Sequence, residues 1–355
     1  MPSQPHKQPV APILISDYDY ELPPELIAQT PLEPRDRSRL LVLDRARDQL
    51  EHRIFRDIIE YLTPEDLLVV NDSRVIPARL HGWRPTGGQA EILLLRPLGE
   101  GRWEALVRPG RRLKLGSKIV LADRRGERTD ACVEIVERRL EGSAVVALPD
   151  AVADTLSAFG EMPLPPYIHE RLHDPERYQT VYSRIEGSAA APTAGLHFTP
   201  GLLANIEQSG ARIAGVTLHV GIGTFQPVKV EDVREHEMHA EWFHVPPEAL
   251  TAIAETRARG GRVIAVGTTS CRTLESINPE QVSADGQSGW TSLFITPGFQ
   301  FRSVDALVTN FHLPRSTLML MVSAFAGRER ILEAYAEAVK NRYRFFSFGD
   351  AMLIL

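Results

Sequence analysis

The sequence predicts an α/β protein in which a large α/β domain is interrupted by a small inserted domain of antiparallel strands. Helix-like and strand-like segments alternate before residue 75 and after residue 160, which is typical of a layer or barrel of mainly parallel strands. Between these parts, short β-rich runs are separated by Gly, Pro and charged turns, which is typical of a small antiparallel barrel or sandwich. We place the large domain at residues 1–74 and 156–355, and the inserted domain at residues 75–155.

The elements follow from local patterns, taken in chain order. Residues 16–30 start extended and continue as a short helix, residues 38–44 and 66–70 are apolar strands, and residues 52–62 have the apolar spacing of a helix. The inserted domain contains the runs ARLHG, AEILLLR, RWEALVR, SKIVLA, ACVEIVE and SAVVALP. Beyond it we expect helices at residues 198–209, 247–259, 270–277, 318–326 and 330–340, and strands at residues 213–220, 262–266, 293–295 and 306–309.

The composition is that of an ordinary globular protein, with 43% hydrophobic and 24% charged residues in a chain of 355. No apolar run approaches the roughly 20 residues that a membrane-spanning helix needs. Cys132 and Cys271 are too few for a disulfide framework or a cysteine zinc site. The first 15 residues lack the pattern of a signal peptide, so we expect a loose N-terminal extension, a cytoplasmic location and no membrane partner.

The net charge of −6 argues against nucleic-acid binding by bulk charge alone. Arginines nevertheless gather locally, at Arg35 and Arg37 and again at Arg111 and Arg112. A solvated surface is the alternative interpretation of each cluster.

Residues 187–198, GSAAAPTAGLHF, consist almost entirely of small residues and have neither helical nor strand periodicity. Such a segment lets the backbone approach a ligand closely. We take Thr193 and Gly195 as candidate substrate-binding residues and His197 as a candidate catalytic residue.

Residues 217–225, TLHVGIGTF, indicate a short strand that runs into a glycine turn. His219 lies at the end of this strand beside small residues, as a catalytic side chain at the floor of a site would. Gly221, Thr224 and Phe225 are the candidate substrate-binding residues of this segment.

Residues 262–275, RVIAVGTTSCRTLE, have the order strand, small polar turn, helix. The N-terminus of such a helix binds anions, and Thr268, Thr269 and Ser270 would present its N–H groups. Arg272 in the first turn would add a forked donor. Ordinary helix capping by Thr and Ser is the alternative.

The segment TNFHLPRSTLMLM places Asn310, Phe311 and His312 at a strand end, before a turn forced by Pro314. Ligands of α/β proteins bind beyond the carboxyl ends of strands, so all three are candidate site residues. The alternative is a loop histidine without a role.

The segment HEMHAEWFH offers nitrogen and carboxylate ligands that would suit zinc, but its spacing matches no established metal motif. We therefore expect no metal, and we take His239 and Glu241 as candidate acid–base or substrate-contacting residues. The chain also lacks the glycine-rich dinucleotide fingerprint, the P-loop and the nucleophile elbow, which argues against the corresponding enzyme classes.

Several segments occur in a characteristic order: YELPPELIAQTPLEPRDRSRLL, DLLVVNDSRVIPARL, ALVRPGRRLKLG, GEMPLPPYI, DPERYQTVY, GSAAAPTAGLHFT, TLHVGIGTFQPV, HEMHAEW, VIAVGTTSCRTLES, VDALVTNFHLPRSTLMLMVSAFAG and FFSFGDAMLIL. Together they resemble the S-adenosylmethionine:tRNA ribosyltransferase-isomerase family of queuosine modification, over nearly the whole chain after Ser16. Cys271 and Phe348 depart from the residues expected there, and the first fifteen residues are extra, but no polar position is affected.

The resemblance implies a barrel-like large α/β domain with an inserted small antiparallel β-barrel domain. It implies an enzyme that moves and isomerises the ribosyl part of S-adenosylmethionine onto 7-aminomethyl-7-deazaguanine at the wobble position of tRNA with a GUN anticodon. The products would be epoxyqueuosine-tRNA, adenine and methionine. S-adenosylmethionine is then a consumed substrate, no cofactor is needed, and we expect a monomer.

This chemistry gives the candidate residues their expected roles. The sulfonium acidifies the neighbouring 5′ carbon and adenine departs more easily when protonated, so an acid and a base are needed. The acid–base pool is His197, His219, His239 and His312 with Glu241, and single roles stay open. The helix start at residues 268–270 with Arg272 would bind the methionine carboxylate.

The RNA substrate calls for a second set of contacts. A flipped-out deazaguanine needs aromatic stacking and hydrogen bonds to its edge, to which Phe225, Phe311 and Asn310 would contribute. The four clustered arginines named above become candidate phosphate contacts.

Two other functions stay open from the residues alone. One is a metal-dependent hydrolase that uses His236, His239 and His244. The other is a non-catalytic tRNA-binding module that reads RNA with the inserted domain, although such a module would not need histidines in small-residue loops.

Overall fold

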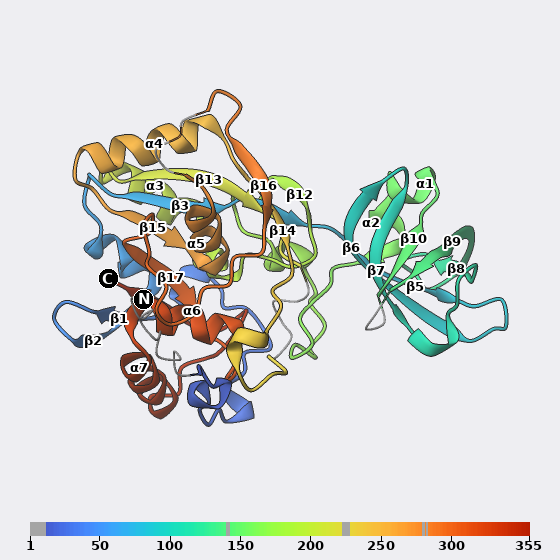
Figure 1. The fold of residues 1–355 in the computed structure, drawn as a ribbon, viewed down its shortest axis with the longest axis horizontal. Coiled ribbons are helices and arrows are strands. Elements are labelled where there is room, and N and C mark those ends of the chain that lie inside the picture. The colour runs from blue at the N-terminus through green and yellow to red at the C-terminus, as the bar shows by residue number, and fades with distance from the viewer. Residues whose placement is uncertain (1–11, 140–142, 222–227, 279–280, 282) are drawn as a thin grey trace, which may run out of the picture.

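The computed structural model describes residues 12–139, 143–221, 228–278, 281 and 283–355. Figure 1 shows a large domain built around one sheet and a smaller β domain beside it, joined by strands that leave and re-enter the large domain.

A nine-stranded sheet forms the centre of the large domain, in the order β16-β14-β13-β3-β15-β17-β18-β1-β2. Its strands are β1 (Arg39–Asp44), β2 (Gln49–Ile54), β3 (Leu67–Asn71), β13 (Arg212–Leu218), β14 (Glu241–Val245), β15 (Val263–Val266), β16 (Gln287–Thr291), β17 (Ala306–Asn310) and β18 (Ala351–Ile354). The four central strands β13, β3, β15 and β17 are parallel, whereas β14 and β16 add antiparallel at one edge. Parallel central strands bring their carboxyl ends to the same side of the sheet, where ligands bind in α/β proteins.

Both faces of this sheet are buried, because successive residues of its strands pack into different cores. On β3, Leu67 and Val69 join one hydrophobic cluster while Leu68 and Val70 join another. The first cluster includes side chains of α4 (Pro247–Ala258), α5 (Gly267–Ser276), α6 (Thr317–Ala326) and α7 (Arg328–Lys340). The second includes side chains of α3 (Pro200–Gln208) and of a 3₁₀ helix at Phe55–Tyr61. The large domain is therefore three-layered.

The small domain is a closed barrel with a core of its own. Its strands follow the order β5-β6-β7-β10-β9-β8, and β5 also pairs with β8, which closes the barrel. They are β5 (Arg79–Trp83), β6 (Gln89–Gly99), β7 (Arg102–Arg108), β8 (Lys118–Ala122), β9 (Arg128–Arg138) and β10 (Ser143–Ala147). The short elements α1 (Asp150–Ala153), α2 (Leu156–Phe159) and β11 (Gly160–Glu161) follow, and β4 (Ser73–Val75) and β12 (Ile185–Ser188) pair where the chain passes between the domains.

The predicted fold class, a large α/β domain with an inserted small antiparallel β barrel, is confirmed. The large domain, expected to be barrel-like, is in the described part of the chain an open sheet whose edge strands β16 and β2 do not pair with each other. Three predicted elements are wrong. Residues 16–30, expected to start extended, start within a 3₁₀ helix at Ile15–Tyr18. The helix expected at residues 52–62 is the end of β2 followed by the 3₁₀ helix, because residues 49–54 pair with β1. The strand expected at residues 293–295 is not formed, and the edge strand lies earlier, at β16.

Among the described residues, no helix is long and apolar enough to cross a membrane.

Candidate active site

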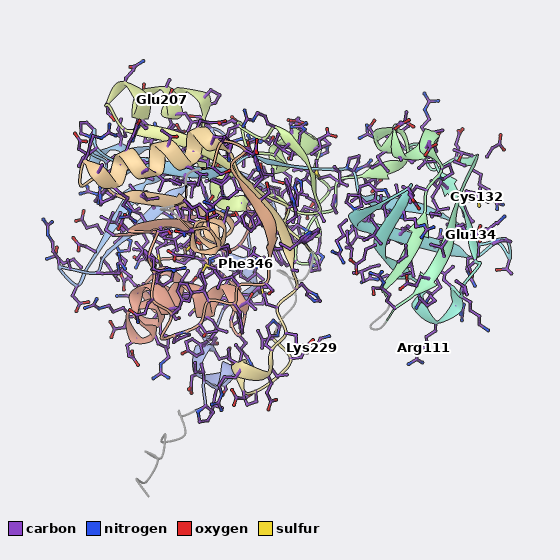
Figure 2. The ribbon with its side chains drawn as sticks, turned by 45° about the horizontal axis from the view of Figure 1, so that its top comes forward. Arg111, Cys132, Glu134, Glu207, Lys229 and Phe346 are labelled. Atoms are coloured by element: carbon purple, nitrogen blue, oxygen red, sulfur yellow. The ribbon has the colours of Figure 1, made fainter. Side chains whose placement is uncertain are left out.

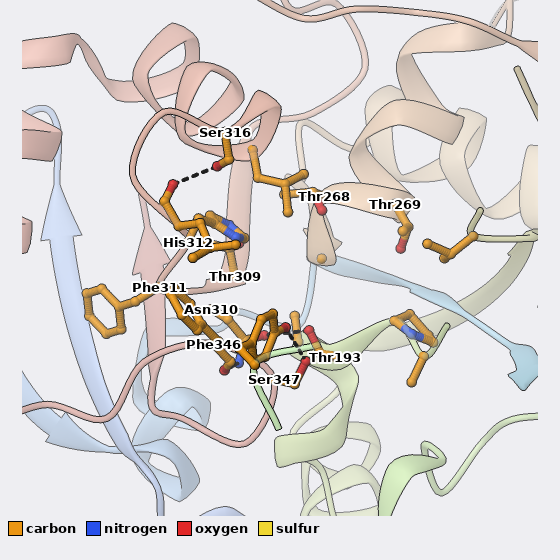
Figure 3. Close-up of a pocket in the computed structure, with 18 residues that line it drawn as sticks. Thr193, Thr268, Thr269, Thr309, Asn310, Phe311, His312, Ser316, Phe346 and Ser347 are labelled. Carbon is orange, nitrogen blue, oxygen red and sulfur yellow. Dashed lines mark hydrogen bonds between the residues drawn. The ribbon is translucent and has the colours of Figure 1, made fainter. Parts of the chain in front are cut away.

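A small cavity of ≈ 60 Å³ lies beyond the carboxyl ends of β15 and β17. The sequence-predicted residues that line it are Thr193, Thr268, Thr269, Asn310, Phe311 and His312. Figure 3 shows Thr268 and Thr269 on one side of this pocket and His312 with Asn310 on the other. The fold therefore brings together three segments that are far apart in the sequence, as predicted from their positions at strand ends.

The N-terminus of α5 forms one wall of the small pocket. Gly267 begins the helix with a φ of 91°, a conformation that only glycine adopts without strain. The first N–H groups of a helix have no partner within it, and they carry its partial positive charge. The hydroxyl Oγ1 of Thr269 is buried without a hydrogen-bond partner, while Ser270 Oγ donates back to the Val266 carbonyl at 2.9 Å. Thr268 and Thr269 thus leave donors for an anion, whereas the Ser270 hydroxyl is used within the helix.

His312 lies on the opposite side of the pocket and is 8% exposed. Its Nε2 is 2.7 Å from the Thr309 hydroxyl, and its backbone N–H donates to Tyr335 Oη at 2.9 Å. Burial lowers the pKa of His312 to about 3. The imidazole is therefore neutral at physiological pH.

His197 has both ring nitrogens engaged by protein groups. Nδ1 is 2.8 Å from Ser38 Oγ, and Nε2 is 3.1 Å from the Nδ2 amide of Asn310. Because an amide N–H only donates, Nε2 accepts and the ring proton lies on Nδ1. The ring stacks on Phe55 at 4.9 Å, and burial together with the positive charges of Arg344 and Arg35 lowers its pKa to about 3. His197 therefore sits behind the pocket as a neutral, fully bonded ring.

Asn310 connects this histidine to the pocket. Its Nδ2 also donates to the Phe346 carbonyl at 3.1 Å, and its Oδ1 accepts from the Thr193 hydroxyl at 3.3 Å. Every polar atom of the Asn310 amide thus has a partner, which fixes the orientation of Thr193.

A much larger cavity, of ≈ 1140 Å³, lies between the barrel and the large domain. His219, Gly221, His239 and Glu241 line it, together with residues of β6 and β7. Val220 lines the small pocket instead, so consecutive residues at the end of β13 face the two cavities. In Figure 2, Lys229, another residue of this cleft, lies on the side of the large domain that faces the barrel.

His219 is held rigidly at the edge of this cleft. Its Nδ1 is 2.9 Å from Ser73 Oγ, and its ring stacks on Trp242 with centroids 5.2 Å apart. The other side of the ring meets Gly187, where an added Cβ would lie 2.6 Å from Nε2 and where φ is 142°. Partial burial lowers the pKa of His219, although the nearby Asp72 carboxylate opposes this shift.

Arg272 does not join the start of α5 as a free donor. Its guanidinium forms a buried ion pair with Glu241, and both side chains are nearly inaccessible, at 4% and 5% exposed. Arg272 Nε also donates to the Leu293 carbonyl at 3.1 Å, and Glu241 Oε1 accepts the Gly221 N–H at 2.8 Å. The pair connects α5, β14 and the backbone of Gly221, three residues after β13.

Other predicted residues take different places. The Phe311 ring is fully buried and points away from the pocket (Figure 3). Its centroid lies 5.3 Å from that of the Tyr335 ring and 5.0 Å from that of the Phe345 ring. Gly195 packs against Tyr182, whose hydroxyl would be 1.9 Å from an added Cβ. Thr224 and Phe225 lie outside the described residues.

None of the four arginines predicted to contact tRNA lines the small pocket or the large cleft. Arg35 donates to the Gln179 and Glu176 carbonyls at 2.6 and 2.9 Å, and burial lowers its pKa. Arg37 is exposed. Arg111 and Arg112 are exposed on the barrel, where Arg111 projects from its lower edge in Figure 2.

No group of three His, Cys, Asp or Glu side chains that could hold a metal ion occurs among the described residues. His236 and His239 line the large cleft, whereas His244 Nδ1 is 2.7 Å from Ser288 Oγ.

The sequence reasoning missed two tryptophans of the cleft, Trp242 and Trp290. Trp242 stands within the HEMHAEWFH segment, whose histidines and carboxylates are its more prominent signal. Trp290 follows a glycine in the polar run QSGWT, whose only signal is a large aromatic residue in an otherwise polar stretch.

Comparisons with known proteins agree with this architecture. A family model described as "Queuosine biosynthesis protein" matches residues 15–354. The S-adenosylmethionine:tRNA ribosyltransferase-isomerase of Symbiobacterium thermophilum is 55% identical over 348 residues, which cover 96% of this chain and 99% of the relative. The enzyme of the same name from Pelotomaculum thermopropionicum is 56% identical over 344 residues, with the same coverage.

A solved structure supports the same assignment. The crystal structure of S-adenosylmethionine tRNA ribosyltransferase from Thermotoga maritima aligns with a TM-score of 0.55 and 46% sequence identity, covering 96% of this chain and 100% of that chain. The chain therefore belongs to the queuosine biosynthesis protein family, alongside S-adenosylmethionine:tRNA ribosyltransferase-isomerases, and the prediction that it is an enzyme of the transferase class is confirmed.

Proposed function

We propose that the protein transfers and isomerises the ribosyl moiety of S-adenosylmethionine onto 7-aminomethyl-7-deazaguanine at the wobble position of tRNA with a GUN anticodon. The products are epoxyqueuosine-tRNA, adenine and methionine. The observation that carries this proposal is the 55% identity to an enzyme of that name over 96% of the chain. S-adenosylmethionine is consumed, no cofactor takes part, and the enzyme works as a cytoplasmic monomer.

The sizes of the two cavities suit this reaction. Small-molecule pockets usually enclose roughly 300–1,000 Å³. The cleft of ≈ 1140 Å³ is large enough for a nucleoside and a flipped base to meet, while the cavity of ≈ 60 Å³ takes only a small group. Val220 lines the small pocket and its neighbours His219 and Gly221 line the cleft, so the two cavities approach each other at this segment.

The methionine carboxylate binds in the small pocket, at the start of α5. The helix N-terminus supplies partial positive charge, and the unpartnered Thr269 hydroxyl supplies a donor. Arg272 takes no part in this contact, because its charge is already neutralised by Glu241.

His219 is the general base that removes the proton from the 5′ carbon beside the sulfonium. It lines the large cleft, and Ser73 and Trp242 fix its ring. Its lowered pKa keeps the imidazole neutral at pH 7, as a base must be. His197 is unsuited to this role because both of its nitrogens are already bonded.

The test is mass spectrometry of the wobble nucleoside after incubation with S-adenosylmethionine and tRNA carrying 7-aminomethyl-7-deazaguanine. We expect epoxyqueuosine, free adenine and methionine. His219→Asn should lower turnover by roughly 10²–10⁴-fold, the usual contribution of a general base. The matched control is His173→Asn, at an exposed histidine outside the cleft. Folded wild-type protein that yields no epoxyqueuosine would refute the proposed function.

A further inference from the structure

We propose that Trp290 and Trp242 form a stacking platform on which the unpaired anticodon nucleotides of the RNA substrate bind, with Arg96 of the barrel facing them. The inference rests on the proposed function, because it names where the RNA of that reaction is held. It replaces the stacking role expected of Phe311, whose ring is enclosed in the core.

Trp290 is unusually accessible for its residue type. It lies on β16, the edge strand of the large sheet, and 54% of it is exposed. It is the one aromatic residue among the exposed large hydrophobic residues of the described chain. Tryptophan contributes strongly where binding surfaces bury it, so an exposed indole at the wall of a cleft marks a contact surface.

The aromatic rings continue inward from Trp290. Trp242 is its directly paired neighbour across β14 and β16, and side chains of such a pair lie on the same face of a sheet. Trp242 in turn stacks on His219 with an interplanar angle of 24°. A row of flat rings therefore leads from the rim of the cleft to the proposed general base.

The barrel supplies positive charge on the facing wall. The Arg96 guanidinium lies 5.0 Å from the centroid of the Trp290 ring. Arg96 pairs with Glu104, and Arg139 pairs with both Glu104 and Glu137, so the two arginines of this group face two carboxylates. The Arg96 side chain is 39% exposed beside the indole, where its N–H groups can donate to a phosphate of the bound RNA.

The carboxylates of Glu235 and Glu237 are suited to bind the deazaguanine of the substrate. Among the described residues, neither Glu235 nor Glu237 has a salt bridge, and both line the cleft. A guanine-type edge presents an N1–H and an amino group, and the aminomethyl substituent adds an ammonium, all of which carboxylates accept. The two indole rings would stack on a flipped nucleotide, the two carboxylates would accept hydrogen bonds from its base, and the Arg96 guanidinium would contact its phosphate.

The experiment measures binding of a synthetic anticodon stem–loop that carries 7-aminomethyl-7-deazaguanine, without S-adenosylmethionine, by fluorescence anisotropy. Base–aromatic stacking predicts that Trp290→Ala weakens binding roughly 5- to 150-fold. The matched control is Trp83→Ala, since Trp83 lies under Arg128 at 5.4 Å on the barrel but does not line the cleft. Trp290→Phe, which keeps an aromatic face, should retain most of the affinity.

The outcomes distinguish a failure of the proposed stacking platform from a failure of the proposed function. Trp290→Ala protein that keeps its circular dichroism and binds the stem–loop as tightly as wild type would overturn the platform, as would equal weakening by Trp83→Ala. If Trp290→Ala does not fold, the platform is overturned by Trp290→Leu protein with wild-type affinity. Wild-type protein that binds the stem–loop, loses that binding in Trp290→Ala and yet forms no epoxyqueuosine would support the platform and refute the proposed function.

Discussion

Acidification should destabilise the large domain through His197, whose ring is buried in neutral form. Its pKa is lowered from 6.5 to about 3 by burial, so in the folded protein it stays neutral at pH 4.5. In the unfolded chain it is protonated at that pH. Because the unfolded state binds more protons, stability falls as the pH drops below 6.5, and the loss continues until about pH 3.

The size of this effect follows from the pKa difference. Between pH 7 and pH 4.5, His197 alone should remove about 2.5 kcal/mol from the free energy of unfolding. Chemical denaturation at both pH values measures the loss. Glutamine is the informative replacement, because it can still reach Ser38 and Asn310 with a donor and an acceptor but does not titrate. His197→Gln should therefore lose about 2.5 kcal/mol less than wild type on acidification.

His173→Gln is the control, since His173 is an exposed histidine of the same domain. The unfolding of the large domain can be followed by itself with Trp83 and Trp103 of the barrel replaced by Phe. If wild type and His197→Gln lose equal stability between pH 7 and pH 4.5, the account of His197 as a buried neutral ring is refuted.

Three further outcomes follow from the contacts of the site. Glu241→Gln should lower the free energy of unfolding by about 3–5 kcal/mol, because it leaves the Arg272 charge buried and unpaired. The double variant Glu241→Gln with Arg272→Met should recover most of the lost stability, as measured by thermal denaturation. Thr269→Val should raise KM for S-adenosylmethionine roughly tenfold without changing the melting temperature, through loss of one donor; unchanged KM would exclude this contact. Gly187→Ala should cost about 1–3 kcal/mol of stability and lower kcat, because its backbone is strained for alanine and its Cβ displaces His219; normal kinetics would contradict this.

The fold was predictable where burial leaves a clear pattern. The central strands β3 and β15 are short continuous apolar runs, which is the sequence pattern typical of strands that are covered on both faces. The edge strands were harder. Residues of β2 and β16 are mostly polar, and their strand conformation comes from pairing with β1 and β14 rather than from local preference.

The part of the site that follows the carboxyl ends of the parallel strands could be predicted from the sequence. Thr268, Thr269 and His312 could be placed together because they follow parallel strands that end on the same side of the sheet. The direction of a side chain is decided by tertiary packing, which explains why Phe311 turned inward and why Arg272 found Glu241, 31 residues away, in place of the helix start.

The most direct test of the central claim follows the fate of the ribosyl carbons. The enzyme would be given tRNA carrying 7-aminomethyl-7-deazaguanine and S-adenosylmethionine labelled with ¹³C either in the ribose or in the methyl group. The mass of the wobble nucleoside would then be measured by mass spectrometry. Ribosyl transfer predicts a mass increase of the nucleoside from the ribose label and none from the methyl label. Incorporation of the methyl label, or of neither label by folded protein, would contradict the account.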